Sequence, residues 1–167
     1  MSKECLSLKS IIKVTITDVK TKKVLDVKYF HNIITNNGLK WIRNQLANVL
    51  YSTDPVFNIE TRLSYIALGS SNTPVGASQT SLGNELIRKE LYPNPDVNCE
   101  TILVDNDKVT YTIYLSEPEL AGETIREIGL FAKSDSTFMV SRALTGNLEK
   151  SGDIEFTIEY TWIVSDN

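Results

Sequence analysis

Apolar and polar residues alternate along residues 154–164, which read IEFTIEYTWIV. Successive side chains of a β-strand point to opposite faces, so one face of this segment is apolar and the other carries Glu and Thr. Six residues make up the apolar face: Ile154, Phe156, Ile158, Tyr160, Trp162 and Val164. This row of aromatic and branched side chains predicts a half-buried strand at the centre of the core.

The same alternation recurs upstream and predicts two hairpins. Residues 12–16 and 24–30 flank a polar segment, and we interpret them as the first hairpin. Residues 101–104 and 109–115 flank Asp105-Asn106-Asp107, whose side chains favour tight turns, and form the second. Further apolar runs at 64–68, 85–91, 125–131 and 137–144 are expected to be strands.

One segment has helical periodicity instead. Five apolar residues recur at the spacing of one helix face: Leu39, Ile42, Leu46, Val49 and Leu50. The polar residues at 35–37 precede them and are candidates for the N-cap. We therefore predict a helix near residues 37–50, reached through a short strand around residues 32–34.

About eight short strands joined by turns, with one inserted α-helix, predict a mainly β fold. The expected architecture is an antiparallel β-sandwich, or a barrel-like arrangement of the same strands. The 167 residues show no break in composition, so we expect a single β-rich domain over residues 1–167.

Charge and hydropathy argue against several classes of partner. The formal net charge is -4, whereas nucleic-acid-binding surfaces usually carry a basic excess, so no nucleic-acid partner is expected. No apolar run approaches the roughly 18 residues of a transmembrane helix, so no membrane partner is expected either. The first residues lack the apolar run of a signal peptide, which favours synthesis and assembly in a cytoplasm.

The residue types that carry catalysis are sparse. His31 is the only histidine, and neither Cys5 nor Cys99 lies in a CxxC motif. The glycine-rich stretch 69–76 lacks the Lys-Ser or Lys-Thr of a phosphate-binding loop. We therefore expect no catalytic residues, no cofactor and no metal site, and hence no enzymatic activity.

Three segments, taken in order, resemble bacteriophage tail-fibre, tail-collar and baseplate-associated proteins. They are 32–39 (NIITNNGL), 65–74 (YIALGSSNTP) with its continuation 80–88 (TSLGNELIR), and 124–131 (TIREIGLF). The resemblance spans roughly residues 32–144. It implies a structural component of a phage or phage-tail-like particle that joins tail, baseplate or fibre proteins. It also implies other virion proteins as partners, a homo-oligomer that is possibly a trimer, and a virion location after assembly in the host cytoplasm.

The long loop at residues 69–80 is the predicted assembly surface. Loops of this length without secondary structure are usually functional or disordered, so we expect mobility in the free protein and order against a neighbouring chain. The candidate contact residues are Ser70, Asn72, Thr73, Pro74, Val75 and Gln79. One account of the nearby polar residues Asn84, Glu85 and Arg88 is charge pairing that pins this loop to the sheet.

The alternative function is a carbohydrate-binding module that recognises the host surface. Sugar sites usually need exposed aromatic platforms beside polar groups. The candidate aromatic residues are Trp41, Tyr51, Tyr92 and Tyr114, which form no cluster in the sequence.

Overall fold

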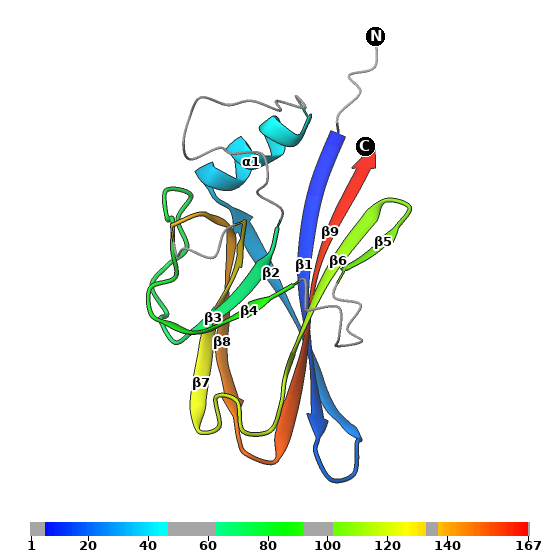
Figure 1. The fold of residues 1–167 in the computed structure, drawn as a ribbon, viewed down its shortest axis with the longest axis vertical. Helices are drawn as coiled ribbons and strands as arrows, with labels where there is room; N and C mark the ends of the chain where they lie inside the picture. Colours follow the sequence, from blue (N-terminus) through cyan, green and yellow to red (C-terminus); the bar gives the residue numbers. More distant parts are fainter. Residues whose placement is uncertain (1–5, 47–62, 92–101, 133–136, 167) are drawn as a thin grey trace.

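A computed structural model describes residues 6–46, 63–91, 102–132 and 137–166 of the chain. The elements in chain order are β1 (Leu6–Asp18), β2 (Val24–Ile34), α1 (Asn36–Leu46), β3 (Tyr65–Gly69), β4 (Glu85–Glu90), β5 (Ile102–Asp105), β6 (Lys108–Leu115), β7 (Glu123–Phe131), β8 (Met139–Lys150) and β9 (Ile154–Asp166). The predicted mainly β fold with one inserted helix is confirmed (Figure 1).

The strands form a single antiparallel sheet instead of two separate ones. Its order is β4-β3-β7-β8-β2-β1-β9-β6-β5, so the described residues form nine strands where about eight were predicted for the chain. The sheet curls into a half-barrel whose two halves face each other (Figure 1). We call β4, β3, β7 and β8 the first half, and β1, β9, β6 and β5 the second half.

Strand β2 carries the sheet from one half to the other. Its residues Val24–His31 pair with β1 in the second half, and Asn32–Ile34 pair with Ser141–Ala143 of β8 in the first half. The short strand predicted around residues 32–34 is therefore the end of β2. This seam between the halves is only three residue pairs long, whereas the ladder between β1 and β9 contains thirteen.

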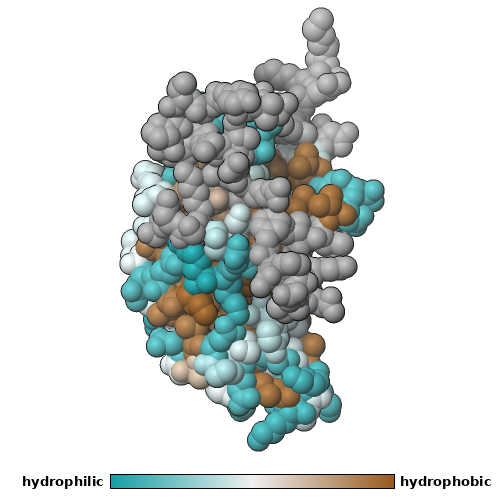
Figure 2. Space-filling view, in the orientation of Figure 1, coloured by the Kyte–Doolittle hydropathy of each residue, from teal (hydrophilic) through white to brown (hydrophobic). Residues whose placement is uncertain are grey.

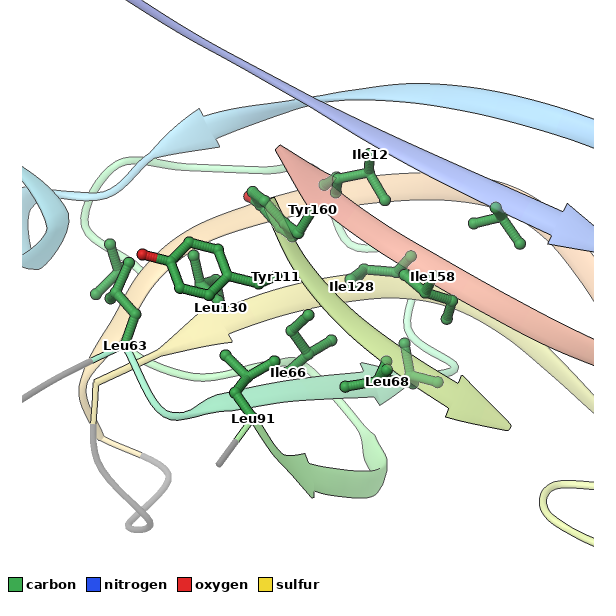
Figure 3. Packing of buried hydrophobic residues seen from close by; sticks show 14 of the residues in the cluster. Ile12, Leu63, Ile66, Leu68, Leu91, Tyr111, Ile128, Leu130, Ile158 and Tyr160 are labelled. Carbon is green, nitrogen blue, oxygen red and sulfur yellow. The ribbon is translucent and has the colours of Figure 1, made fainter. Parts of the chain in front are cut away.

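The core lies between the two facing halves. Isoleucines and leucines of β3 and β7 meet aromatic and branched side chains of β1, β6 and β9 (Figure 3). The residues labelled in that view are Ile12, Leu63, Ile66, Leu68, Leu91, Tyr111, Ile128, Leu130, Ile158 and Tyr160. Lys89 of β4 adds a polar link between the halves, because its Nζ donates to the Tyr114 carbonyl at 2.8 Å and to Glu119 at 2.6 Å.

The prediction for the C-terminal strand is confirmed. β9 lies between β1 and β6, and its Phe156, Ile158 and Tyr160 side chains are fully buried. The Tyr160 hydroxyl hydrogen-bonds with Ser141 at 2.5 Å, which joins β9 to β8 across the core. Only the last residue of the predicted row, Val164, is exposed.

Helix α1 begins as predicted but turns a different face to the sheet. Thr35 is the N-cap, since its Oγ1 accepts a hydrogen bond from the Gly38 amide at 3.1 Å. A Cβ on Gly38 would lie 2.1 Å from the Val140 carbonyl oxygen, so the first helical turn rests directly on β8. This contact fixes the rotation of the helix, which packs Trp41 and Ile42 against the core and leaves Leu39 exposed. The predicted residues beyond 46 lie outside the described part.

The two predicted hairpins are also confirmed. β5 and β6 are joined at Asn106, whose φ of 44° suits an asparagine in a tight turn. Asp18 caps the turn between β1 and β2 by accepting hydrogen bonds from the amide and hydroxyl of Thr21. Residues 133–136, between the predicted strands 125–131 and 137–144, are expected to form a further hairpin turn and lie outside the described residues.

Candidate assembly site

Two charged residues lie side by side on the outer face of the first half. Glu127 of β7 pairs with Leu144 of β8, and Arg142 of β8 pairs with Gly129 of β7, so the two are diagonal neighbours. A register shift between Ile125 and Glu127 turns Glu127 away from the core. Both side chains are nevertheless fully buried, because the segment that follows β3 covers them.

The Glu127 carboxylate binds backbone amides of residues 70–84, which lie between β3 and β4 and which we call the covering segment. Its Oε1 accepts hydrogen bonds from the amides of Ser71 at 3.2 Å and Asn84 at 2.9 Å. Its Oε2 accepts from the Gly83 amide at 3.0 Å and from Nε of Arg142 at 2.8 Å. The carboxylate is thus bound on both oxygens, as a buried charge requires.

Arg142 reaches the middle of the same loop. Its Nη1 donates to the carbonyl oxygen of Thr73 at 3.0 Å and to Oε1 of Gln79 at 2.9 Å. Its Nη2 lies 2.8 Å from Oε2 of Glu127, close enough for ion pairing but without hydrogen-bond geometry. We call Glu127 and Arg142 together the buried clamp.

Backbone hydrogen bonds attach the loop at three further points. The Ser70 amide donates to the Asn84 carbonyl at 2.9 Å, and the Asn36 amide at the start of α1 donates to Ala77 at 2.7 Å. The Met139 amide of β8 donates to Thr80 at 3.0 Å. These contacts run against the expectation that the loop orders only on a neighbouring chain, because its own domain already satisfies its backbone.

A small apolar cluster lies under the same covering segment. It consists of Ala67, Leu82, Phe131 and Met139. A Cβ on Gly129 would lie 2.8 Å from the Phe131 ring and 2.9 Å from Leu82, so this glycine makes room for side chains. Strand β7 therefore presents both a charge and an apolar surface to the loop.

The polar residues at 84–88 act differently from the proposed account. Arg88 pairs with Glu85 at 2.7 Å and stacks over the Phe131 ring, 3.9 Å from its centroid. Asn84 does hold the loop, through its backbone and through a side-chain bond to Ser70. The charge pair that pins the loop is the buried clamp, whose two residues come from strands far along the chain.

The predicted contact residues fall into two groups. Ser70 and Gln79 have internal partners, since Gln79 binds Arg142, the Gly76 amide and the Pro74 carbonyl. Asn72, Thr73 and Pro74 are exposed, and Val75 is half-buried. The first group shapes the loop, and the exposed residues are the ones that another chain can touch.

The clamp could have been noticed in the sequence. Glu127 directly precedes the apolar run IGLF, and Arg142 lies within the mainly apolar run MVSRAL. A charge within or beside a buried run implies an opposite partner. What the sequence does not indicate is which charge pairs with which, because 15 residues and a hairpin separate these two.

The residues considered for chemistry are not brought together. His31 is exposed on β2. Within the described residues, no group of three or more His, Cys, Asp or Glu side chains is placed to hold a metal ion. No helix in this part of the chain has the length and apolar character needed to cross a membrane.

The described aromatic candidates for sugar binding are also apart. Trp41 packs edge-on against Trp162, with ring centroids 6.2 Å apart, beside an apolar cavity of about 210 Å³. Tyr114 lies on the opposite, outer face of the sheet, and its hydroxyl donates to Glu155. Tyr51 and Tyr92 lie outside the described residues.

Comparisons with protein-family models, with curated proteins and with solved structures gave no match for this chain.

Proposed function

We propose that this chain is a non-enzymatic structural module of a phage or phage-tail-like particle, which attaches tail, baseplate or fibre proteins to one another. Its partners are other virion proteins, and it reaches the virion after assembly in the host cytoplasm. The loop at residues 70–80 is the contact surface. The proposal combines the resemblance of three sequence segments with the way the fold uses them.

The single observation that carries the proposal is the convergence of these segments on one loop. Ala67 and Leu68 of the second segment pair with Gly129 and Ile128 of the third, and Glu127 of the third binds the loop. The first segment contributes Asn36, whose amide binds the same loop. All three segments thus serve to hold a polar loop in place on the outside of the sheet.

The chemistry of the clamp favours a structural role over catalysis. A general base or a nucleophile needs a lone pair that can reach a substrate. Both Glu127 oxygens are occupied by amides and by Arg142, and both side chains are sealed from solvent. A buried ion pair of this kind holds a surface in place, and a surface held in place lowers the ordering cost of binding a partner.

The carbohydrate-binding alternative is less well supported. The two described aromatic candidates lie on different faces, and the cavity beside Trp41 is lined almost wholly by apolar groups, which do not match sugar hydroxyls. A glycan array with the purified protein distinguishes this function from assembly.

The proposed function is tested by incorporation into particles. We expect mass spectrometry of purified particles to detect the protein, and tail or baseplate genes to neighbour its gene. The double variant Asn72→Arg/Pro74→Glu alters only exposed loop residues, so it should fold normally but fail to incorporate. Asp107→Arg, in the exposed β5–β6 turn, is the matched control and should incorporate. Particles that lack the protein would refute the proposal, as would normal incorporation of the loop variant.

A further inference from the structure

Strand β2 has a long free edge. Residues Val24–His31 pair with β1 on one side, and on the other side β8 pairs only with Asn32–Ile34. In the described part of the chain, the first eight residues of β2 therefore have one edge without a strand partner. An unpaired edge is a template for adding another strand.

Apolar and aromatic side chains along this edge are exposed to solvent. Leu25 is 57%, Val27 37% and Tyr29 59% exposed. In Figure 2, hydrophobic residues appear among hydrophilic ones at the lower end of the molecule, where the β1–β2 hairpin lies. The outermost strands of the sheet are protected differently, since β5 has only four residues and β4 is largely charged and bridged through Lys89.

The amide of Val27 identifies the orientation of the edge. It donates to the carboxylate of its neighbour Asp26 at 2.8 Å, whereas a ladder amide would donate to a β1 carbonyl. The N–H and C=O of a strand residue point to the same side in an antiparallel ladder. Val27 thus directs its backbone groups to the free edge, and the Asp26 carboxylate satisfies the amide in the absence of a partner strand.

The edge is self-complementary in one register. When two copies pair antiparallel about a two-fold axis at Val27, Asp26 faces Lys28 of the other copy, and Lys28 faces Asp26. Leu25 then faces Tyr29, an aliphatic–aromatic pair of the kind that stabilises sheets. Moving the axis to Asp26 or to Lys28 would instead place like charges directly opposite each other, which is destabilising.

We propose that the free edge of β2 is a homodimer interface, in which two chains form a continuous sheet through antiparallel β2–β2 pairing centred on Val27. A two-fold interface uses the same patch on both subunits, as this register does. On pairing, the Val27 amide leaves Asp26 for the facing Val27 carbonyl, and the Asp26 carboxylate, which lies 3.8 Å from Nζ of Lys28 in its own chain, can then bind Lys28 of the second copy as well. The register shift in the β1–β2 ladder leaves Leu25 without a partner in β1, so the regular part of the β2–β2 ladder is Asp26–Lys28, and the two Leu25–Tyr29 pairs flank it. The proposal does not depend on the proposed function, because it rests on the edge alone.

A charge-swap series tests the pairing by sedimentation velocity over a dilution series of the intact chain. We expect the wild type to form a dimer, and Asp26→Lys and Lys28→Asp each to dissociate at protein concentrations at least tenfold higher. The double variant Asp26→Lys/Lys28→Asp should dimerise as the wild type does, because the opposite charges face each other again. An equimolar mixture of the two single variants should form a heterodimer, in which both facing pairs of residues 26 and 28 have opposite sign.

The Asp26 side chain is 53% exposed and the Lys28 side chain 41% exposed, so circular dichroism and the thermal midpoint should show that each variant is folded. A wild type that stays monomeric at every concentration would leave this edge to a strand of another protein and overturn the proposal. A trimer would overturn it as well, as would a dimer that the single reversals leave intact.

Discussion

The Glu127 carboxylate and the Arg142 guanidinium lie 2.8 Å apart with both side chains fully buried, where β7, β8 and the loop after β3 meet. Glu127 binds the two ends of the covering segment, at Ser71 and Gly83, and Arg142 binds its middle, at Thr73. One ion pair therefore replaces the apolar core that a loop of this composition cannot make.

Removing the cation from this pair is expected to be costly. Arg142→Met leaves Glu127 buried without its opposite charge, and breaking a buried pair in this way typically costs about 3–5 kcal/mol. Urea denaturation should show this loss in the free energy of unfolding. Glu159→Gln is the control, because it breaks the Lys13–Glu159 pair, which is 38% and 32% exposed and is worth about 0–1 kcal/mol. Equal losses of unfolding free energy in the two variants would show that the buried clamp contributes no more to stability than an exposed ion pair.

The clamp also predicts the dynamics of the loop. In the isolated wild-type protein, the amides of Ser71, Gly83 and Asn84 should exchange slowly with solvent deuterium, because each donates to Glu127. In Arg142→Met, the loop around Thr73 and Gln79 should exchange faster, since it loses its attachment to the guanidinium. Fast exchange throughout the loop of the wild type would restore the original expectation of a loop that orders only on a partner.

The central position of β9 predicts a large effect of truncating its aromatic residues. Phe156→Ala removes a fully buried ring and should cost about 3–5 kcal/mol in the free energy of unfolding. Val164→Ala, at the exposed end of the same row, should leave the thermal midpoint nearly unchanged. A Phe156→Ala midpoint within a degree or two of the parent would mean that β9 is peripheral.

The close approach of α1 to β8 predicts that Gly38 cannot be replaced. The added methyl group in Gly38→Ala would lie 2.1 Å from the Val140 carbonyl oxygen, so the helix must move, at a cost of about 1–3 kcal/mol or more. Gly76→Ala is the matched control, because its Cβ would meet only the Gln79 side chain at 3.8 Å. We expect that variant to be neutral or stabilised by up to about 1 kcal/mol. Thermal melts of both proteins separate the two outcomes.

A hydrogen bond on the outer face of the second half predicts a pH dependence. The Tyr114 hydroxyl donates to Glu155, and this bond, with Lys22 in addition, lowers the pKa of Glu155 from its ordinary value of 4.5. The same bond raises the pKa of Tyr114 to about 12. The contribution of Glu155 to stability is therefore complete above pH 4.5 and is lost as the pH falls through the lowered pKa of the folded state.

Tyr114→Phe tests this linkage through urea midpoints measured between acid and neutral pH. The variant should be less stable than the wild type at neutral pH, and the difference should shrink below the pKa of the unfolded carboxyl. Tyr29→Phe, at an exposed tyrosine of β2, should show no such trend. A difference that is constant across this range would separate the role of Tyr114 from the ionisation of Glu155.

The sequence predicts the parts of this fold that depend on local pattern. Alternation finds β9, since its period of two follows directly from strand geometry, and Asn106 marks a tight turn. The helix start is equally local, because Thr35 caps its own neighbours. The rotation of α1 is not local. It depends on Gly38 resting on Val140, so the apolar spacing predicted a buried Leu39 that is in fact exposed.

The candidate site shows the same division. A long polar loop is visible in the sequence as a run of turn-forming residues, and the exposed Asn72 and Pro74 belong to it. Its attachment is decided by pairing between strands, which places Glu127 and Arg142 as diagonal neighbours only once the register is known. Sequence reasoning therefore found the loop but offered charge pairing by the nearby Asn84, Glu85 and Arg88 as one account of its attachment, whereas Arg88 binds Glu85.

Because the ladder between β2 and β8 is short, the contact between the two halves should respond to temperature differently from the ladders within each half. In the described part of the chain, the ladder between β2 and β8 has three residue pairs, so the halves adhere chiefly through the apolar side chains of the core. Hydrogen-bonded ladders and apolar contacts respond differently to temperature, and apolar association weakens on cooling. Cooling should therefore weaken the contact between the two halves while the ladder between β1 and β9 stays intact. Low temperature is thus the condition under which we expect the half-barrel to open.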